Sequence, residues 1–160
     1  VTALVVSLSP AAGRLNVLSR VKEPNVQSTN LTFDEVYART KALTVQAAAE
    51  VDANERTLLA NLRGRHVAQY HTGSAEVRAR LRGIAVENRA RDLMNQDELL
   101  LQYIETRKIN PGADVRSLEQ PIWLDWTTPE QWPRKVLLKS GTKGYEGVGL
   151  PLFTRPPRPE

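Results

Sequence analysis

The feature that most constrains the fold is a helical repeat of apolar residues that starts near Thr32. The repeat is formed by Val36, Leu43, Ala47, Val51, Leu58 and Leu62, which recur at spacings of four or seven residues. These spacings place the side chains on one face of an α-helix. Residues 32–35 read TFDE and match a capping box, in which Thr32 and Glu35 satisfy each other's backbone amides. Few helix breakers precede Gly64, so the pattern predicts one long helix over residues 33–69.

A second helix is predicted after the turn HTGS at residues 71–74, with Ser74 or Thr72 as its N-cap. Its apolar face is formed by Val77, Leu81, Ile84, Met94 and Leu99. The helix either runs to Lys108 or restarts at the cap-like NQDE of residues 95–98, and INPG at 109–112 ends it. Two long helices joined by a short loop lie antiparallel. The predicted fold is therefore mainly α, a long antiparallel helical hairpin over residues 32–110 with extended arms at both ends.

The two predicted arms cover residues 1–31 and 111–160. Seven of the ten prolines lie between Pro121 and Pro159, and no periodicity is sustained there. Residues 128–131 (TPEQ) predict the start of a one-turn helix, and residues 136–139 (VLLK) a short strand. The loop SGTKGYEGVG is Gly-rich, and TRPPRPE is expected to be extended. We expect a Trp-, Pro- and Gly-rich C-terminal arm without its own core.

All three tryptophans of the chain lie in this arm, within QPIWLDWTTPEQWP. Tryptophan buries a large apolar area and is enriched at interface hot spots. The segment is expected to anchor the arm onto a helical surface, which belongs either to the chain's own hairpin or to a neighbouring subunit. The candidate partner-binding residues are Trp123, Trp126, Trp132, Tyr145, Phe153, Arg155 and Arg158.

Arginine dominates the positive charge, with sixteen Arg against six Lys and a formal net charge of +4. Eight arginines fall between Arg56 and Arg91, and guanidinium groups bind phosphate well. The arginines considered for contact with nucleic acid or another anion are Arg63, Arg65, Arg78, Arg82 and Arg89. On a helical wheel the cluster divides between two faces, whereas an element that binds a nucleic-acid groove would concentrate its arginines on one side. The division favours two interfaces with salt bridges, or a solvated hairpin tip whose long side chains cover apolar surface.

The sequence carries no pattern typical of catalysis or cofactor binding. It has no cysteine, which excludes disulfides, thiolate catalysis and iron–sulfur clusters. His66 and His71 are five residues apart, whereas two histidines on one helix that bind a metal are three or four apart. The Gly-rich loop lacks the helix that a phosphate-binding loop precedes. We therefore expect a protein that is not an enzyme and needs no cofactor or metal.

The composition of the N-terminal residues bears on the cellular compartment. No apolar run is long enough to span a bilayer. The first acidic residue is Glu23, and an N-terminus that is acid-free and contains Ser and Arg resembles a transit peptide. A mitochondrion or other organelle fits this composition, and the cytoplasm and a virion are alternatives.

The predicted architecture suggests a role. A helical hairpin with arms that lack their own core is typical of subunits that hold large assemblies together. The leading hypothesis is a non-catalytic structural or accessory subunit of a respiratory or ATP synthase complex, a ribosome or a virion, which clamps neighbouring protein subunits. The alternative is a component that binds RNA or DNA through the Arg-rich region of residues 56–91.

Overall fold

A computed structural model describes residues 30–107 and 111–159. The chain divides into two units, Val1–Leu31 and Thr32–Glu160. The predicted N-terminal arm, with its transit-like composition, lies almost wholly outside the described residues. The account below concerns the second unit.

Helix α2 (Phe33–Ala53) begins at the predicted capping box. The Glu35 amide donates to the Thr32 hydroxyl at 3.3 Å, and the Thr32 amide donates to the Glu35 carboxylate at 2.7 Å. The buried face of α2 repeats at helical spacing and consists of Val36, Thr40, Thr44, Ala47 and Val51. The capping-box prediction is confirmed.

The predicted single helix over residues 33–69 is wrong, because the chain leaves the helix at Asn54. Asn54 has φ −150° and ψ 115°, ends α2 and caps α3 (Glu55–Ala60). Its side-chain oxygen accepts a hydrogen bond from the Arg56 amide at 2.8 Å. An asparagine that bonds the following backbone in this way competes with continuation of the helix. A further break precedes α4 (Gly64–Thr72), so three helices replace the predicted one.

Helix α5 (Ala75–Asn95) begins at Ser74, whose hydroxyl accepts from the Val77 amide at 3.3 Å. This confirms Ser74 as the N-cap, although the helix ends at Asn95 and not at Lys108. Three ion pairs show that α2 and α5 run antiparallel. Residues with higher numbers in α2 pair with residues that have lower numbers in α5. The pairs are Asp52–Arg82, Glu50–Arg89 and, just beyond the end of α5, Arg39–Asp97.

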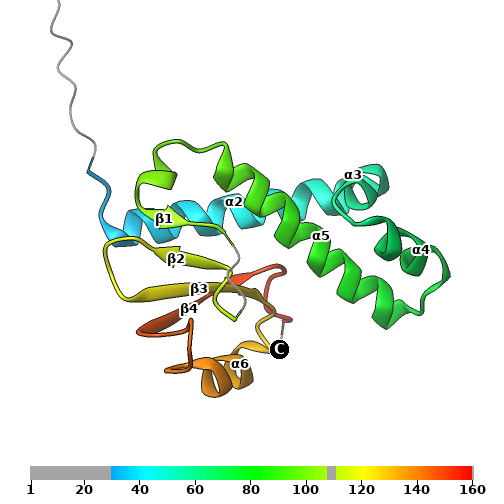
Figure 1. Ribbon diagram of the computed structural model, residues 1–160. Coiled ribbons are helices and arrows are strands. Elements are labelled where there is room, and N and C mark those ends of the chain that lie inside the picture. Colours follow the sequence, from blue (N-terminus) through cyan, green and yellow to red (C-terminus); the bar gives the residue numbers. More distant parts are fainter. Residues whose placement is uncertain (1–29, 108–110, 160) are drawn as a thin grey trace, which may run out of the picture. The chain divides into compact units, whose positions relative to one another are not determined.

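Beyond α5 the chain builds a four-stranded sheet (Figure 1). A 3-10 helix, η1 (Leu100–Gln102), leads to β1 (Ile104–Glu105), β2 (Val115–Ser117), β3 (Ile122–Thr127), helix α6 (Trp132–Lys139) and β4 (Val148–Phe153). The strand order is β1-β2-β3-β4; the first two pairings are antiparallel and β3 is parallel to β4. The expected mainly α hairpin with an extended C-terminal arm is therefore wrong, and the fold mixes α and β.

Strand β3 lies inside the sheet and is buried on both faces. Its sequence therefore lacks the pattern from which a strand is usually predicted. Trp123 and Asp125 lie on the face that α6 covers, and Trp132 of α6 packs in the Trp123 cluster. Trp126 lies on the other face, where its indole donates to Thr44 of α2 at 3.1 Å. A strand that is covered on both sides lacks the polar–apolar alternation of a half-exposed strand. Trp123 and Trp126, which were predicted to lie in an extended arm, are therefore on a strand of the sheet.

Residues 136–139 are helical in α6 and do not form the predicted strand. Pro133 lies in the first turn of α6, where a proline's missing amide costs no hydrogen bond. The predicted helix start at residues 128–131 is instead a turn, in which the Gln131 amide donates to the Thr128 carbonyl at 3.1 Å. A proline does lie in the first turn of a helix in this region, but it is Pro133 and not Pro129.

Strand β4 lies at the edge of the sheet. In the middle of its outer side, at Pro151, no backbone group is available to pair with another strand. The Val148 and Thr154 amides each donate at 2.9 Å to carbonyls on the β3 side. Every second residue of a parallel strand bonds to the same neighbour, so Pro151 turns its backbone to the outside. Proline has no backbone N–H that could donate a hydrogen bond on this side. The Pro151 carbonyl accepts a hydrogen bond from the Tyr37 hydroxyl at 2.8 Å. Addition of a foreign strand is thereby blocked at this point.

We expect Thr44→Val to lower the free energy of unfolding by about 1–3 kcal/mol, because it leaves a buried indole N–H without an acceptor. Thr44 and Trp126 are both buried, and the hydroxyl is the acceptor of the Trp126 Nε1–H. Urea unfolding followed by circular dichroism measures the difference. Thr44→Ser restores the hydroxyl and should recover most of the loss; equal stability of the valine and serine variants would contradict the prediction.

Stability should fall on acidification partly through Asp97. Burial raises the pKa of Asp97, but hydrogen bonds from Arg39 at 2.5 Å and from the Leu100 amide at 3.1 Å outweigh it and hold the pKa below the ordinary 3.8. A carboxyl with a lowered folded-state pKa stabilises the fold above its unfolded pKa, and this contribution is lost as pH falls through the folded pKa. The expected loss lies below about pH 4.

The matched variant is Asp97→Asn, which cannot ionise. Urea unfolding at a series of pH values should show wild type more stable than Asp97→Asn at pH 6, with the gap closing below about pH 4. Two curves that stay parallel down to about pH 2.5 would rule out this contribution.

Candidate functional site

Two buried carboxylates, Asp114 and Asp125, lie between α6 and the sheet, beside α5. A pocket of about 390 Å³ opens there, and we call it the α6 pocket. Its lining residues are Glu87, Pro111, Gly112, Asp114, Trp126, Lys135, Lys139 and Tyr145. They come from α5, the segment before β2, β3, α6 and the loop before β4, so the pocket exists only when the sheet and α6 are assembled.

Asp125 is the centre of this charge cluster and is only 1% exposed. Its Oδ2 lies 3.1 Å from the Nζ atoms of both Lys135 and Lys139. The two lysines are one helical turn apart on α6, which places both ammonium groups on the same face. A buried carboxylate is tolerated only when it is paired and hydrogen-bonded, and here two cations supply that compensation.

Just before the start of β2, the side chains of Asp114 and Asp125 take the place of the backbone hydrogen bonds between the two strands. The Asp114 amide donates to Asp125 Oδ1 at 2.8 Å, and the Trp126 amide donates to Asp114 Oδ2 at 3.1 Å. The two carboxylates therefore hold their strands together reciprocally. This arrangement fixes the position of Asp125 beneath α6.

Lys139 is held in its protonated form. Burial lowers the pKa of Lys139, but the hydrogen bond to Tyr145 at 3.0 Å and the charge of Asp125 outweigh it, so the pKa is raised above its ordinary value. The Tyr145 hydroxyl in turn donates to the Gly112 carbonyl at 2.8 Å. Because a nucleophilic amine must lose its proton, Lys139 is suited to hydrogen bonding and charge pairing and not to covalent catalysis.

Arg91 of α5 supports the opposite wall of the α6 pocket. Its guanidinium lies 4.9 Å from the centroid of the Trp126 ring and pairs with Glu87 at 3.1 Å. Its Nη2 is 3.9 Å from the nearer Asp114 oxygen, and its Nε donates to the Thr106 carbonyl at 3.3 Å. Arg91 thus contacts both carboxylates as well as the Trp126 ring.

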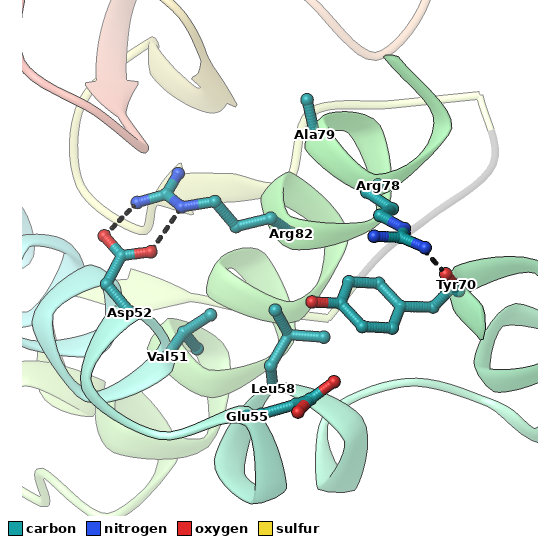
Figure 2. A pocket seen from close by; sticks show the side chains of 8 residues that line it. All are labelled: Val51, Asp52, Glu55, Leu58, Tyr70, Arg78, Ala79 and Arg82. Carbon is teal, nitrogen blue, oxygen red and sulfur yellow. Dashed lines mark hydrogen bonds and ion pairs between the residues drawn. The ribbon is translucent and has the colours of Figure 1, made fainter. Parts of the chain in front are cut away.

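A second pocket, of about 330 Å³, lies among α2, α3, α4 and α5 (Figure 2). Arg82 makes a two-pronged pair with Asp52 at 2.5 and 2.6 Å, and Arg78 donates to the Tyr70 carbonyl at 3.2 Å. Arg82 also donates to the Thr154 carbonyl at 3.1 Å, which ties the segment after β4 to the helices. Arg78 and Arg82, the two arginines that line this pocket, therefore both make contacts within the chain.

The predicted partner-binding aromatic residues are mostly internal. Trp123 is 1% exposed, and its ring centroid lies 5.8 Å from that of Trp132 and 5.0 Å from that of Tyr145. Gly149 admits this ring, because a Cβ there would come within 2.2 Å of Trp123 Cζ2. Trp126 is buried on the other face of β3. Of the two alternatives for the tryptophans, packing on the chain itself describes these rings.

The remaining predicted partner-binding residues lie at the C-terminal end. Phe153 is the last residue of β4 and is half-buried. Arg155 and Arg158 both reach Glu130 in the turn before α6, at 2.9 and 3.4 Å. Both arginines therefore contact a residue of the same chain.

The five arginines considered for nucleic acid fall into two groups. Arg82 and Arg89 pair with Asp52 and Glu50 of α2. Arg63, Arg65 and Arg78 are exposed, and the first two flank the start of α4, whose sequence contains no acidic residue. The structure does not bring all five together on one surface.

Sequence reasoning missed Asp114, Asp125, Lys135 and Lys139, although two signals were present. Asp125 is a single charge within the apolar run IWLDW, and the two lysines have helical i, i+4 spacing. The lysine spacing has meaning only if residues 132–139 are helical, whereas the sequence predicts a strand over residues 136–139. The misassigned helix therefore concealed the site.

Two other expectations concern metals and membranes. Within residues 30–107 and 111–159, no three histidine or carboxylate side chains are grouped so that they could hold a metal ion. In the same part of the chain, no helix combines the length and the apolar character that crossing a bilayer requires.

The comparisons with known proteins add no relative. No protein-family model matches the chain, and neither the curated proteins nor the solved structures give a match.

Proposed function

We propose that this protein is a non-catalytic accessory subunit of a larger assembly and that it binds a neighbouring protein through the outer face of α6. The observation that carries this proposal is a pair of adjacent leucines on that face. Leu137 is 81% exposed and Leu138 is 63% exposed. Arg134, one turn earlier, is also exposed on the same side. A respiratory or ATP synthase complex, a ribosome and a virion are the assemblies we consider.

The inner side of α6 supports this proposal. Trp132 and Val136 pack into the Trp123 cluster, while Lys135 and Lys139 are paired with Asp125. The helix is therefore held in place from beneath before any partner arrives. An anchor that is already ordered loses little conformational entropy on binding, and apolar anchors beside an arginine suit an interface.

The mechanism differs from the clamp expected from the sequence. The tryptophans act indirectly, because they hold α6 in position and leave the contact itself to its outer residues. Single exposed apolar residues are common on protein surfaces, so the proposal rests on two neighbours presented by one fixed helix.

The test compares the full chain with the double variant Leu137→Ser/Leu138→Ser and with Val45→Ser, an apolar residue of α2 that is 64% exposed. Each tagged protein is expressed in its native host, crosslinked and purified, and stoichiometric partners are identified by mass spectrometry. The double variant should lose a partner that wild type and Val45→Ser retain, with a melting temperature within about 2 °C of wild type. An unchanged partner set in the double variant would overturn the proposed surface, and the absence of any stoichiometric partner of wild type would overturn the subunit role.

A second candidate function is nucleic-acid binding, which the exposure of Arg63 and Arg65 favours. Both lie at the start of α4, a helix that carries two histidines and no acid. Fluorescence anisotropy with single-stranded RNA and duplex DNA tests it. Binding should weaken steeply between 50 and 200 mM salt, and Arg63→Ala/Arg65→Ala should reduce it more than Arg134→Ala does. Equal effects of the two variants would contradict a site on α4.

A further inference from the structure

A third pocket lies between the C-terminal part of α2, α3 and α5, and we call it the α3 pocket. Its volume is about 480 Å³, which is within the usual range of small-molecule sites. Its lining residues are Glu50, Arg56, Thr57, Ala60, Asn61 and Arg89. Two guanidinium groups and one carboxylate give this lining a net charge of +1.

Hydrogen bonds at both ends of α3 fix it against its neighbours, so the pocket is formed before any ligand arrives. At the start of α3, the Asn54 side-chain oxygen accepts from the Arg56 amide at 2.8 Å. At its end, the Asn61 carbonyl accepts from Asn88 Nδ2 of α5 at 2.8 Å. Asn88 directly precedes Arg89, so the arginine of α3 and the arginine of α5 line the same pocket.

Arg89 is held from one side and keeps most of its donors. Its Nε donates to Glu50, which also accepts from Gln46 Nε2 at 2.9 Å. The hydrogen bond from Arg89, together with that from Gln46, holds the pKa of Glu50 below its ordinary value, so the carboxylate stays charged. A guanidinium has five N–H donors, and no acceptor among the described residues engages the two Nη groups of Arg89. These groups form a planar fork that suits phosphate oxygens.

Arg56 supplies a second guanidinium, and it is exposed. Its amide is bonded to Asn54, but in residues 30–107 and 111–159 no acceptor engages its side chain. Thr57 adds a hydroxyl to the same lining, next to Asn61, whose Nδ2 donates to the Thr57 carbonyl at 2.9 Å. The pocket therefore presents two guanidinium forks and a hydroxyl with donors to spare.

We infer that the α3 pocket binds the terminal phosphate of a small phosphate monoester. The forks of Arg56 and Arg89 and the Thr57 hydroxyl are its donors. A phosphate monoester carries about −1.5 to −2 charges at pH 7 and three strong acceptor oxygens, which suits two guanidinium groups. A carboxylate has one charge and two oxygens, so a single fork is enough for it.

The shape of the site favours a terminal phosphate over a phosphodiester. A terminal phosphate can enter a pocket end-on, whereas a diester in a polynucleotide carries a sugar on each side. This inference does not depend on the proposed protein contact through α6, or on Arg63 and Arg65 of the nucleic-acid candidate.

Isothermal titration calorimetry on the full chain, at low ionic strength where screening is weak, tests the site. The probes are inorganic phosphate, glycerol phosphate and phenyl phosphate, compared with acetate and dimethyl phosphate. We expect at least one of the first three to bind with a Kd below about 1 mM and at least about tenfold more tightly than acetate and dimethyl phosphate. A Kd above about 1 mM for all three would overturn the proposal. A smaller preference over acetate would indicate a general anion site, and over dimethyl phosphate a site for diesters such as those of nucleic acid; either result would also overturn it.

Three variants with the same loss of charge locate the binding. Arg56→Gln and Arg89→Gln should each weaken the binding of the best probe about tenfold or more. Arg80→Gln removes an exposed arginine of α5 that does not line the pocket, and its Kd should stay within about twofold of wild type. Arg56→Gln should melt within about 2 °C of wild type, because the side chain is exposed. Unchanged affinity in either pocket variant, or an equal loss in Arg80→Gln, would overturn the proposal.

Discussion

Trp123→Ala should lower the free energy of unfolding by about 3–5 kcal/mol, the range observed when a large aromatic residue is removed from a core. Trp123 is the largest fully buried side chain in the described part of the chain. Its ring contacts Trp132 and Tyr145 and lies on the backbone of Gly149. Because Gly149 belongs to β4 and Trp132 to α6, the cavity would open where three elements meet and could not close by a shift of one of them.

Equilibrium urea unfolding, followed by far-ultraviolet circular dichroism, measures this loss. Trp132→Ala is the matched control, because the same side chain is removed from a position that is only partly buried. Its cost should be smaller than that of Trp123→Ala. Equal costs for the two variants would mean that Trp123 is not the centre of the cluster.

Asp125→Ala is expected to have a comparable effect, about 3–5 kcal/mol, because it removes one member of a buried ionic network and leaves the others uncompensated. Lys135 and Lys139 would lose their common carboxylate, and the Asp114 amide would lose its acceptor. The two cations would then repel each other beneath α6. The helix should loosen first, since both lysines belong to it.

Hydrogen exchange of the α6 amides, measured together with global unfolding, separates local from global loss. Asp125→Asn keeps the shape and one oxygen acceptor but removes the charge, so its stability should lie between that of wild type and that of Asp125→Ala. If Asp125→Asn were as stable as wild type, the lysine pairs would contribute nothing and the account of the cluster would fail.

Local signals in the sequence located the starts of α2 and α5 correctly. Thr32 and Ser74 cap α2 and α5 because a short polar side chain there satisfies a free amide, an interaction that depends only on neighbouring residues. The break at Asn54 was missed because the apolar period continues across it and Asn54 is tolerated in many helices. Its departure from the helix is visible only in the backbone angles.

The sheet could not be predicted for a different physical reason. The parallel partner of β3 is β4, about 26 positions later in the chain with α6 between them, and such pairing leaves no local periodicity. Pro151 in β4 and the prolines around β3 favour irregular structure when only neighbours are considered. An edge strand accepts a proline whose missing amide would face outwards, and the position of that edge depends on the whole sheet.

The candidate site could not be predicted either, because its residues come from separate elements of the fold. Asp125 and Lys139 were visible as charged residues, but nothing in their neighbourhood showed that they meet. Their contact requires that residues 132–139 form a helix and that this helix covers the face of β3 on which Asp125 lies. Charge clusters assembled from separate elements are therefore the features that sequence patterns predict least well.

The order of β3 and β4 along the chain has a consequence for biosynthesis. The Tyr37–Pro151 hydrogen bond joins residues 114 positions apart, and β4 is the parallel neighbour of β3. During translation β3 is made before β4, so β3 has no partner on that side until residues 148–153 have left the ribosome. Contacts of such high sequence separation slow folding. A ribosome that stops before Val148 would therefore hold a chain whose central strand still has an open edge.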